Sequence, residues 1–535
     1  MPSSFRTAIH DLKPVMVAFD DASNARRREL LRRLSRMRLP LTRTLTDYVN
    51  VLMFLTAYPS DAEERRLTEA ELERVALFVR RTHPRDKKHL ANSGLPYTDT
   101  LSTYSHDLLY WMTSRKQLRI QIDSFWNPTV RLAEALPFTL PSLERDLAAT
   151  GLDGKPLLAA LVRQPRARIA FLLAQFAGLN ANPELKDYLF DGLHLYLRLR
   201  PADRRFSKAF NRLHRPDAFF HSEIIRGFDQ RELLDRKLPR PASLTHPKRE
   251  SIVEAARFAL MLLQRETDPT TFLDETSLRY YELERGISVA IFGMVASRQL
   301  PLESYVGYTL FKNGYPAAYG GCWIYGRRAL FGINVFEAFR GGESGFVMCQ
   351  LLRVYRQVFG VDYFEVEPYQ YGQGNPEGIQ SGAFWFYYRH GFRPIEQPLA
   401  DLATSEQALI TRNRAYRSPA SVLRKLAQGP IALILKGGAP QRSSDVRERV
   451  TEYIQERYLG DRDAAQAGSR RSFCKRAGHL GRLNVGEDRV LSEVSLWAEA
   501  CNIRASRSLA LLRRMVRIKP VDVYEYQKLL IKLLG

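Results

Sequence analysis

The segment from residue 302 to residue 339 constrains the fold most, because it predicts three antiparallel strands in immediate succession. It reads LESYVGYTLFKNGYPAAYGGCWIYGRRALFGINVFEAF and is rich in β-branched and aromatic residues, which favour strands. Asn313-Gly314 predicts a type I′ hairpin turn, since both central positions of that turn need positive φ. A second turn is predicted at Gly326-Arg327, and the third strand at about Leu330 to Phe339. The chain therefore contains a sheet.

The residues that follow predict a loop, a helix, a strand and a second helix. The loop Arg340 to Gly345 is rich in glycine, and such a loop before a helix N-terminus can hold an anion with its backbone N–H groups. VDYFEVEPYQY predicts a buried strand, and SGAFWFYYRHGF predicts a helix that stops at Gly391. The first helix is predicted to end at Gly360, and its apolar residues form one stripe: Val347, Leu351, Val354 and Val358.

Two motifs in this order resemble the GNAT superfamily of acyl-CoA-dependent N-acyltransferases, over residues about 275 to 398. Ala383 to Phe392 fits A-x-x-x-Y-x-x-x-G-F. Val335 to Arg340 fits V-x-P-x-(aromatic)-R, except that Glu337 replaces the proline, and Arg340 to Gly345 fits the ends of R-x-x-G-x-G/A. The resemblance implies an α/β (α+β) protein with a GNAT-like mixed twisted sheet and flanking helices. It implies acetyl-CoA or another acyl-CoA as co-substrate and an amine acceptor, either a small molecule or a protein.

The same resemblance assigns roles to single residues. Tyr387 stands where the family places the acid that protonates the departing thiolate, while Tyr388 points about 100° away around the helix and is expected to pack. Glu337 is the first candidate for the general base, and the weaker candidates are Glu365, Glu367 and His390. The residues expected to bind the cofactor are Val335, Arg340, Gly341, Gly342, Ser344 and Gly345.

Two departures from the family pattern leave the acyl donor open. Glu343 replaces a glycine of the pyrophosphate loop, where its carboxylate would repel the diphosphate or pair with Arg340. The loop Gly372 to Gly378 is long, and Gln380 stands where the family often has asparagine. One alternative is a Fem-type aminoacyltransferase that uses aminoacyl-tRNA, which a second GNAT-like half in the N-terminal region would support. Another is a catalytically inactive GNAT-like binding protein.

The flanking regions resemble no family and divide the chain into three parts. Residues 1–245 are predicted to be mainly helical, with a capping box at Thr68 and Glu71 and a proline-rich basic linker at 236–250. Residues 246–405 form the acyltransferase-like domain. Residues 406–535 are predicted to be a basic helical region.

Charge, cysteine content and apolar runs bear on the partners and the cellular location that the sequence predicts. The 80 Lys and Arg exceed the 58 Asp and Glu by 22, and residues 411–535 alone hold 25 basic against 12 acidic side chains. This excess predicts a polyanion or nucleic acid as a possible partner of the C-terminal region. The four cysteines are widely separated, and no metal is expected. No signal segment is recognised, and the longest apolar run, 286–296, is too short for a membrane span, so a cytoplasmic location is predicted.

Overall fold

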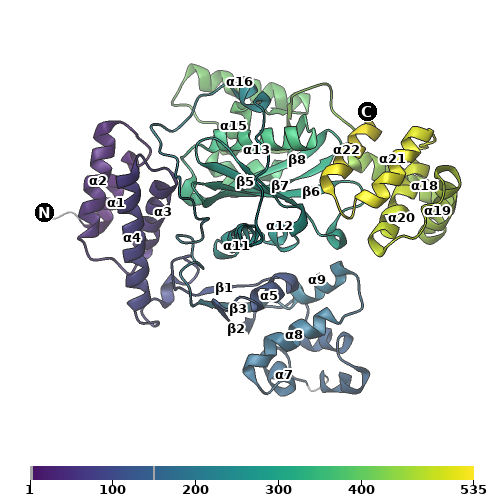
Figure 1. The fold of residues 1–535 in the computed structure, drawn as a ribbon, viewed down its shortest axis with the longest axis horizontal. Helices are drawn as coiled ribbons and strands as arrows, with labels where there is room; N and C mark the ends of the chain where they lie inside the picture. Colours follow the sequence, from purple (N-terminus) through teal and green to yellow (C-terminus); the bar gives the residue numbers. More distant parts are fainter. Residues whose placement is uncertain (1–3, 149–150) are drawn as a thin grey trace.

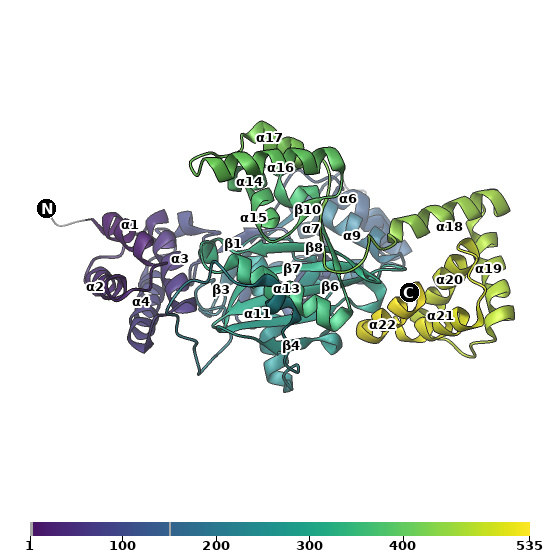
Figure 2. The same ribbon diagram turned by 90° about the horizontal axis from the view of Figure 1, so that it is seen from above.

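An eight-stranded sheet forms the centre of the molecule, between N-terminal helices on one side and C-terminal helices on the other (Figures 1 and 2). The computed structural model describes residues 4–148 and 151–535. The sheet confirms a mixed α/β protein. Its strands are β4 (Arg279–Glu282), β5 (Ile287–Gly293), β6 (Ser304–Lys312), β7 (Tyr315–Tyr325), β8 (Arg328–Val335), β9 (Tyr363–Val366), β10 (Arg393–Pro394) and β11 (Ile431–Ile434).

The strand order is β10-β11-β9-β8-β7-β6-β5-β4. Within the described residues, β8 and β9 are the one parallel pair of this sheet, and every other neighbour is antiparallel. The predicted hairpins β6–β7 and β7–β8 are confirmed, with φ of 44° at Asn313 and 88° at Gly314. The third strand ends at Val335 rather than Phe339, because residues 337–339 form a 3-10 turn.

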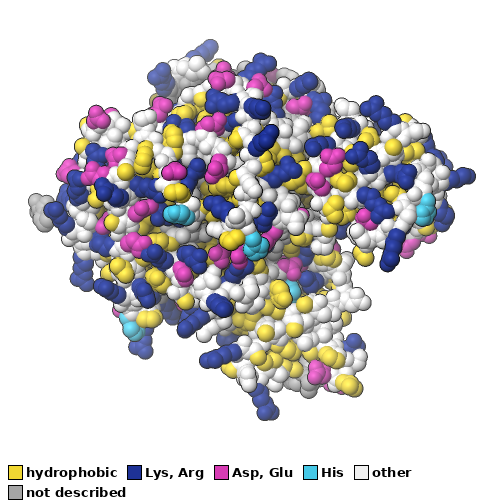
Figure 3. Space-filling model, viewed as in Figure 1, with side chains coloured by type: hydrophobic (Ala, Val, Ile, Leu, Met, Phe, Trp, Pro, Cys, Tyr) yellow, Lys and Arg dark blue, Asp and Glu magenta, His cyan; other side chains and the backbone are white. Residues whose placement is uncertain are grey.

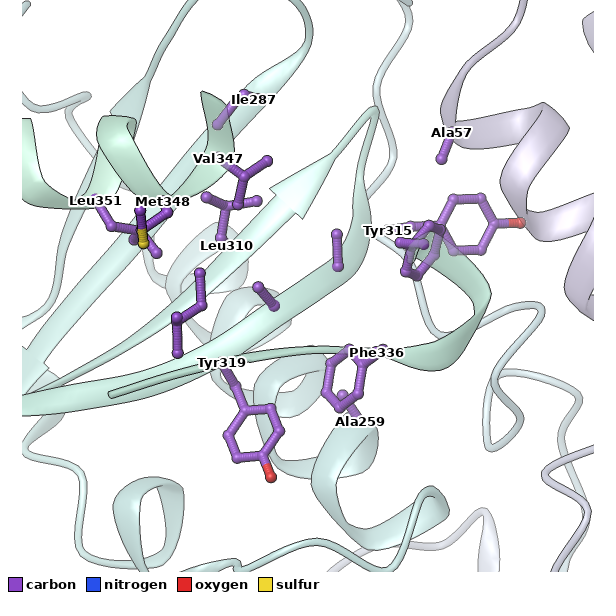
Figure 4. Packing of buried hydrophobic residues seen from close by; sticks show 14 of the residues in the cluster. Ala57, Ala259, Ile287, Leu310, Tyr315, Tyr319, Phe336, Val347, Met348 and Leu351 are labelled. Carbon is purple, nitrogen blue, oxygen red and sulfur yellow. The ribbon is translucent and has the colours of Figure 1, made fainter. Parts of the chain in front are cut away.

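Helices cover both faces of this sheet. Helix α13 (Ser344–Phe359) lies on one face, where its Val347, Met348 and Leu351 pack against Leu310 (Figure 4). Helix α11 (His246–Leu262) lies on the other face, toward which Tyr319 and Phe336 project (Figure 4). The predicted apolar stripe and the stop at Gly360 are both confirmed, since Gly360 adopts the left-handed conformation with φ of 69°.

The N-terminal region is not only helical. Four helices come first: α1 (Phe5–Val15), α2 (Asp21–Ser35), α3 (Arg43–Ala57) and α4 (Ala62–Arg81). A second, three-stranded antiparallel sheet follows, in the order β1-β3-β2, and packs on helices of its own. Its strands are β1 (Thr100–Ser102), β2 (Leu118–Phe125) and β3 (Leu195–Pro201), and its helices include α5 (His106–Thr113), α7 (Gly154–Leu161), α8 (Arg168–Ala177) and α9 (Pro183–Gly192).

The predicted capping box at Thr68 is wrong. Asp61 caps α4 instead, where its carboxylate accepts a hydrogen bond from the Glu64 backbone N–H at 2.8 Å. Thr68 lies buried within the helix, and its hydroxyl donates back to the carbonyls of Glu64 and Arg65. Helix α4 therefore starts almost two turns before the predicted cap.

The predicted linker is irregular chain in its first part and helical in its second. Residues 236–245 contain no helix or strand, and α11 begins at His246. At the other boundary, residue 405 falls inside α16 (Gln397–Arg412), and β11 beyond it inserts into the central sheet between β9 and β10. The sheet thus takes its last strand from residues past 405.

The remaining C-terminal residues form a helical bundle that is anchored to the sheet. The helices of this bundle are α18 (Ser443–Tyr458), α19 (Arg462–Ala477), α20 (Val485–Ala500), α21 (Ser506–Ile518) and α22 (Val523–Leu534). Helix α17 (Ala420–Leu426) instead lies beside α16, and its Leu423 and Leu426 belong to the core of the central sheet. Tyr524 on α22 donates a hydrogen bond to the Ser277 carbonyl at 2.7 Å, and Tyr526 donates to the Leu302 carbonyl at 2.8 Å. Lys and Arg side chains are spread over the visible face, on N-terminal and C-terminal helices alike (Figure 3). In the described part of the chain, no helix has the length and apolar character that crossing a membrane requires.

Candidate functional site

A pocket of about 480 Å³ opens where β8 and β9 diverge. The two parallel strands pair only at Arg328, Ala329 and Leu330 of β8. Strand β9 ends at Val366, and the chain then turns at Pro368 into a short 3-10 helix, because proline cannot continue the hydrogen-bond ladder. The last residues of β8 consequently face the pocket, which is lined there by Ile333, Asn334 and Val335.

Three of the expected cofactor-binding residues lie together in this pocket with Tyr387. Val335 from the end of β8, Arg340 from the loop and Ser344 from the start of α13 line the same space as Tyr387 from α15 (Ala383–Arg389). These residues span 53 positions of the chain. The structure therefore brings both sequence motifs to one place.

Tyr387 is almost fully buried beside Phe392 and Tyr371, with ring centroids 5.5 and 6.3 Å away. Burial raises the pKa of the Tyr387 phenol above its usual value, so the hydroxyl stays protonated and can donate a hydrogen bond at neutral pH. The helix ends as predicted, with φ of 86° at Gly391. Tyr388 instead packs under the Arg393 guanidinium, 3.9 Å from the ring centroid.

Packing inside the protein explains the glycine at two of the three loop positions that carry one. A Cβ at Gly345 would overlap the His390 ring, whose Nδ1 donates a hydrogen bond to the Phe386 carbonyl at 2.8 Å. A Cβ at Gly342 would lie 2.6 Å from the Tyr58 hydroxyl on the far side of the loop. Gly341 has φ of 91° and open space around it. At Gly342 and Gly345, neighbouring side chains alone exclude a larger residue.

Glu343 points away from the pocket, contrary to the expected position beside the diphosphate. Its carboxylate is buried and forms ion pairs with Lys312 at 2.7 Å and Arg285 at 2.6 Å, and it accepts a hydrogen bond from the Ile225 backbone N–H. Burial opposes ionisation, but the two cations hold the pKa of Glu343 below its usual value. The expected pairing with Arg340 is also wrong, since Arg340 pairs with Glu377 at 2.6 Å.

The structure does not bring Glu337 together with Tyr387. Glu337 is exposed at the start of the 3-10 turn and faces a separate recess lined by Lys208 and Asn50. The other expected carboxylates are also engaged or outside the pocket: Glu365 pairs with Arg328, and Glu367 is exposed before Pro368.

Tyr319 and Glu266 form the polar pair that the sequence did not reveal. The Tyr319 hydroxyl donates to the Glu266 carboxylate at 2.9 Å, and both residues line the pocket that contains Tyr387. The Tyr319 ring stacks on Phe336, with centroids 5.1 Å apart, on the face of the sheet turned toward α11 (Figure 4). Glu266 follows α11 in the sequence QRETD, which matches no motif. Only the packing of α11 against β7 brings the two together.

Positive charge borders the same pocket. Arg265, Arg340 and Arg389 all line it. Arg340 is paired with Glu377, whereas Arg265 and Arg389 form no ion pair with any residue in the ranges 4–148 and 151–535. Two guanidinium groups are thus free to meet an anionic ligand.

The described residues contain no group of three or more His, Cys, Asp or Glu side chains placed to hold a metal ion. Comparison of the chain with protein-family models, with curated proteins and with solved structures finds no match.

Proposed function

We propose that the protein is an N-acyltransferase that takes an acyl group, acetyl in the simplest case, from acyl-CoA. The observation that carries this proposal is the pocket between the diverging ends of β8 and β9, which gathers Val335, Arg340, Ser344 and Tyr387 from both motifs. The edge of β8 beyond Leu330 offers backbone groups to an extended ligand, because β9 no longer pairs with it. Arg265 and Arg389 supply charge for the phosphates of the donor.

The pocket also contains groups suited to the chemistry of acyl transfer. The acceptor ammonium first loses a proton to a general base. We assign this role to Glu266 in place of Glu337, because Glu266 lines the pocket with Tyr387. The amine nitrogen then attacks the thioester carbonyl, the C–S bond breaks, and the nitrogen loses its second proton as the amide forms. The CoA thiolate leaves with a hydrogen bond from the Tyr387 phenol, through which it gains its proton. One proton is released to solvent overall.

The experiment that tests the proposal is titration calorimetry of the full-length protein with acetyl-CoA, alongside native mass spectrometry for a retained CoA species. We expect binding of acetyl-CoA and much weaker binding of acetyl-pantetheine, which lacks the nucleotide phosphates that the arginines would hold. Failure to bind any acyl-CoA at millimolar concentration would overturn the proposal. The two alternatives would then remain: an aminoacyltransferase that uses aminoacyl-tRNA, and a binding protein without catalytic activity.

The aminoacyl-tRNA alternative receives no support from the N-terminal region. That reading expects a second GNAT-like half there, whose sheet would contain a parallel pair. The sheet found there has three strands, and both of its described pairings are antiparallel. The acyl-CoA donor is therefore preferred.

A further inference from the structure

A second pocket, of about 570 Å³, adjoins the pocket that contains Tyr387, which we call the donor pocket. Its walls come from the end of β1 and the residues after it (102–105), from the end of α9 and the residues after it, and from the end of α11 and the residues after it (260–268). Arg265 and Glu266 line both pockets. Because Glu266 also accepts the hydrogen bond from Tyr319, it stands at the border between the two spaces.

The second pocket is acidic in a chain whose net charge is +22. Asp191, Glu266 and Asp268 line it, and none of them forms an ion pair with another described residue. Arg265 is the one Lys or Arg in the described lining. Burial, and after it the nearby carboxylates of Asp187 and Asp268, raise the pKa of Asp191 to about 6, although the Arg298 guanidinium opposes this rise.

The acidic side chains behind this pocket are already neutralised. Arg298 pairs with both Asp107 and Asp187, and Lys186 pairs with Asp107 at 3.2 Å. The carboxylates without an ion pair among the described residues are thus those that line the open space. A bound cation would relieve their mutual repulsion.

Tyr104 provides an independent indication of a ligand. Its side chain lines the pocket and is only 7% exposed, yet its hydroxyl has no hydrogen-bond partner among the described residues. The neighbouring Ser105 hydroxyl is also buried without a partner. Buried hydroxyls are normally hydrogen-bonded, and a phenol oxygen can accept a hydrogen bond from an ammonium group.

We propose that this pocket binds the acyl acceptor and that the acceptor is a small aliphatic di- or polyamine. This inference rests on the proposed acyl transfer. One amino group lies at Glu266, next to the donor pocket, where it loses its proton and is acylated. A second ammonium group lies between Asp191 and Asp268, and the Tyr104 and Ser105 hydroxyls accept hydrogen bonds from the amine. The two charges of the acceptor thus meet different carboxylates of the pocket lining.

The test is titration calorimetry of the full-length protein with 1,4-diaminobutane and with 1-aminobutane, which has one amino group fewer. We expect the diamine to bind at least tenfold more tightly. The double variant Asp191→Asn/Asp268→Asn should lose at least tenfold in diamine affinity, and Tyr104→Phe should lose several-fold with an unchanged melting temperature. Asp463→Asn, an exposed carboxylate on the distant helix α19, is the matched control and should bind the diamine like wild type.

Equal affinity for the two amines, or unchanged diamine affinity in the double variant, would overturn the acceptor assignment. Acetyl-CoA titration of the same samples separates this result from a failure of the proposed function. Acetyl-CoA binding without diamine binding leaves acyl transfer in place and removes only the acceptor. Diamine binding without any acyl-CoA binding leaves an amine site and removes the donor.

Discussion

The loop between β8 and α13 has two sides that differ in every physical respect. On one side Glu343 is buried between Lys312 and Arg285, and Gly342 and Gly345 sit against Tyr58 and His390. On the other side Arg340 and Ser344 line an open pocket with Tyr387. Residues that are adjacent in sequence thus face the protein interior and the pocket separately. A mutation on the buried side is expected to change the free energy of unfolding, and one on the pocket side to change turnover or affinity.

The largest effect is expected on the pocket side, from Tyr387→Phe. In the proposed reaction, removing the phenol hydroxyl takes away the proton donor to the leaving thiolate, and the loss of a positioned acid costs ~10²–10⁴-fold in rate. The free energy of unfolding should stay within about 1 kcal/mol of wild type, because the ring remains in its packed position. Steady-state kinetics with acetyl-CoA and the best amine acceptor measure the effect. Tyr388→Phe is the control, and equal rates in both variants would remove Tyr387 from catalysis.

On the buried side, Glu343→Gln should lower the free energy of unfolding by about 3–5 kcal/mol, because it leaves the buried Lys312 charge without its partner. Urea unfolding followed by circular dichroism measures this loss. Glu377→Gln removes a carboxylate from the exposed pair with Arg340 and should cost no more than about 1 kcal/mol.

The stability loss caused by Glu343→Gln should also depend on pH. Burial lowers the pKa of Lys312 to about 8 despite the pull of Glu343, so the folded protein releases this proton at a lower pH than the unfolded chain does. The Glu343→Gln deficit should accordingly be smaller at pH 9 than at pH 7, since a neutral Lys312 needs no counter-ion. A deficit that does not change between these pH values would mean that the lost stability comes from another contact.

Gly345→Val should destabilise the fold by about 1–3 kcal/mol, because the new side chain overlaps the His390 ring. The double variant Gly345→Val/His390→Ala should recover part of this loss, since it removes the ring from the same space. Thermal unfolding of the four proteins of this cycle measures the coupling. Additive losses, together with a selective loss of acetyl-CoA binding, would place Gly345 on the pocket side instead.

The smallest effect is expected from Arg389→Gln, which should weaken acetyl-CoA binding by about fivefold to tenfold, or about 1 kcal/mol. The Arg389 guanidinium lines the pocket and forms no ion pair within the described residues, so its charge is available to a phosphate. Arg393→Gln is the matched control, because Arg393 stacks on Tyr388. Calorimetric titration should show no change in the control, and equal weakening in both would indicate a non-specific charge effect.

The sequence by itself determined the elements that depend on neighbouring residues. Asn313-Gly314 specified its hairpin because two consecutive positive φ values suit few other residues. The spacing of apolar residues specified α13, and the left-handed conformation that glycine accepts marked its end and that of α15. The alternation of β3, with Leu195, Leu197 and Leu199 buried, is also present in the sequence and is typical of a strand.

Only the tertiary structure decided which distant residues meet. Strand β11 joins the sheet between β9 and β10 from 65 residues beyond Val366. The packing of separate elements brings Glu343 into ion pairs with Lys312 and Arg285, and it brings Glu266 into its hydrogen bond with Tyr319. The sequence shows that a carboxylate is present, and local periodicity predicts the helix or strand on which it lies. Its charge partner is decided by long-range packing, because the cost of burying a charge is recovered only where an opposite charge or a donor is brought to it.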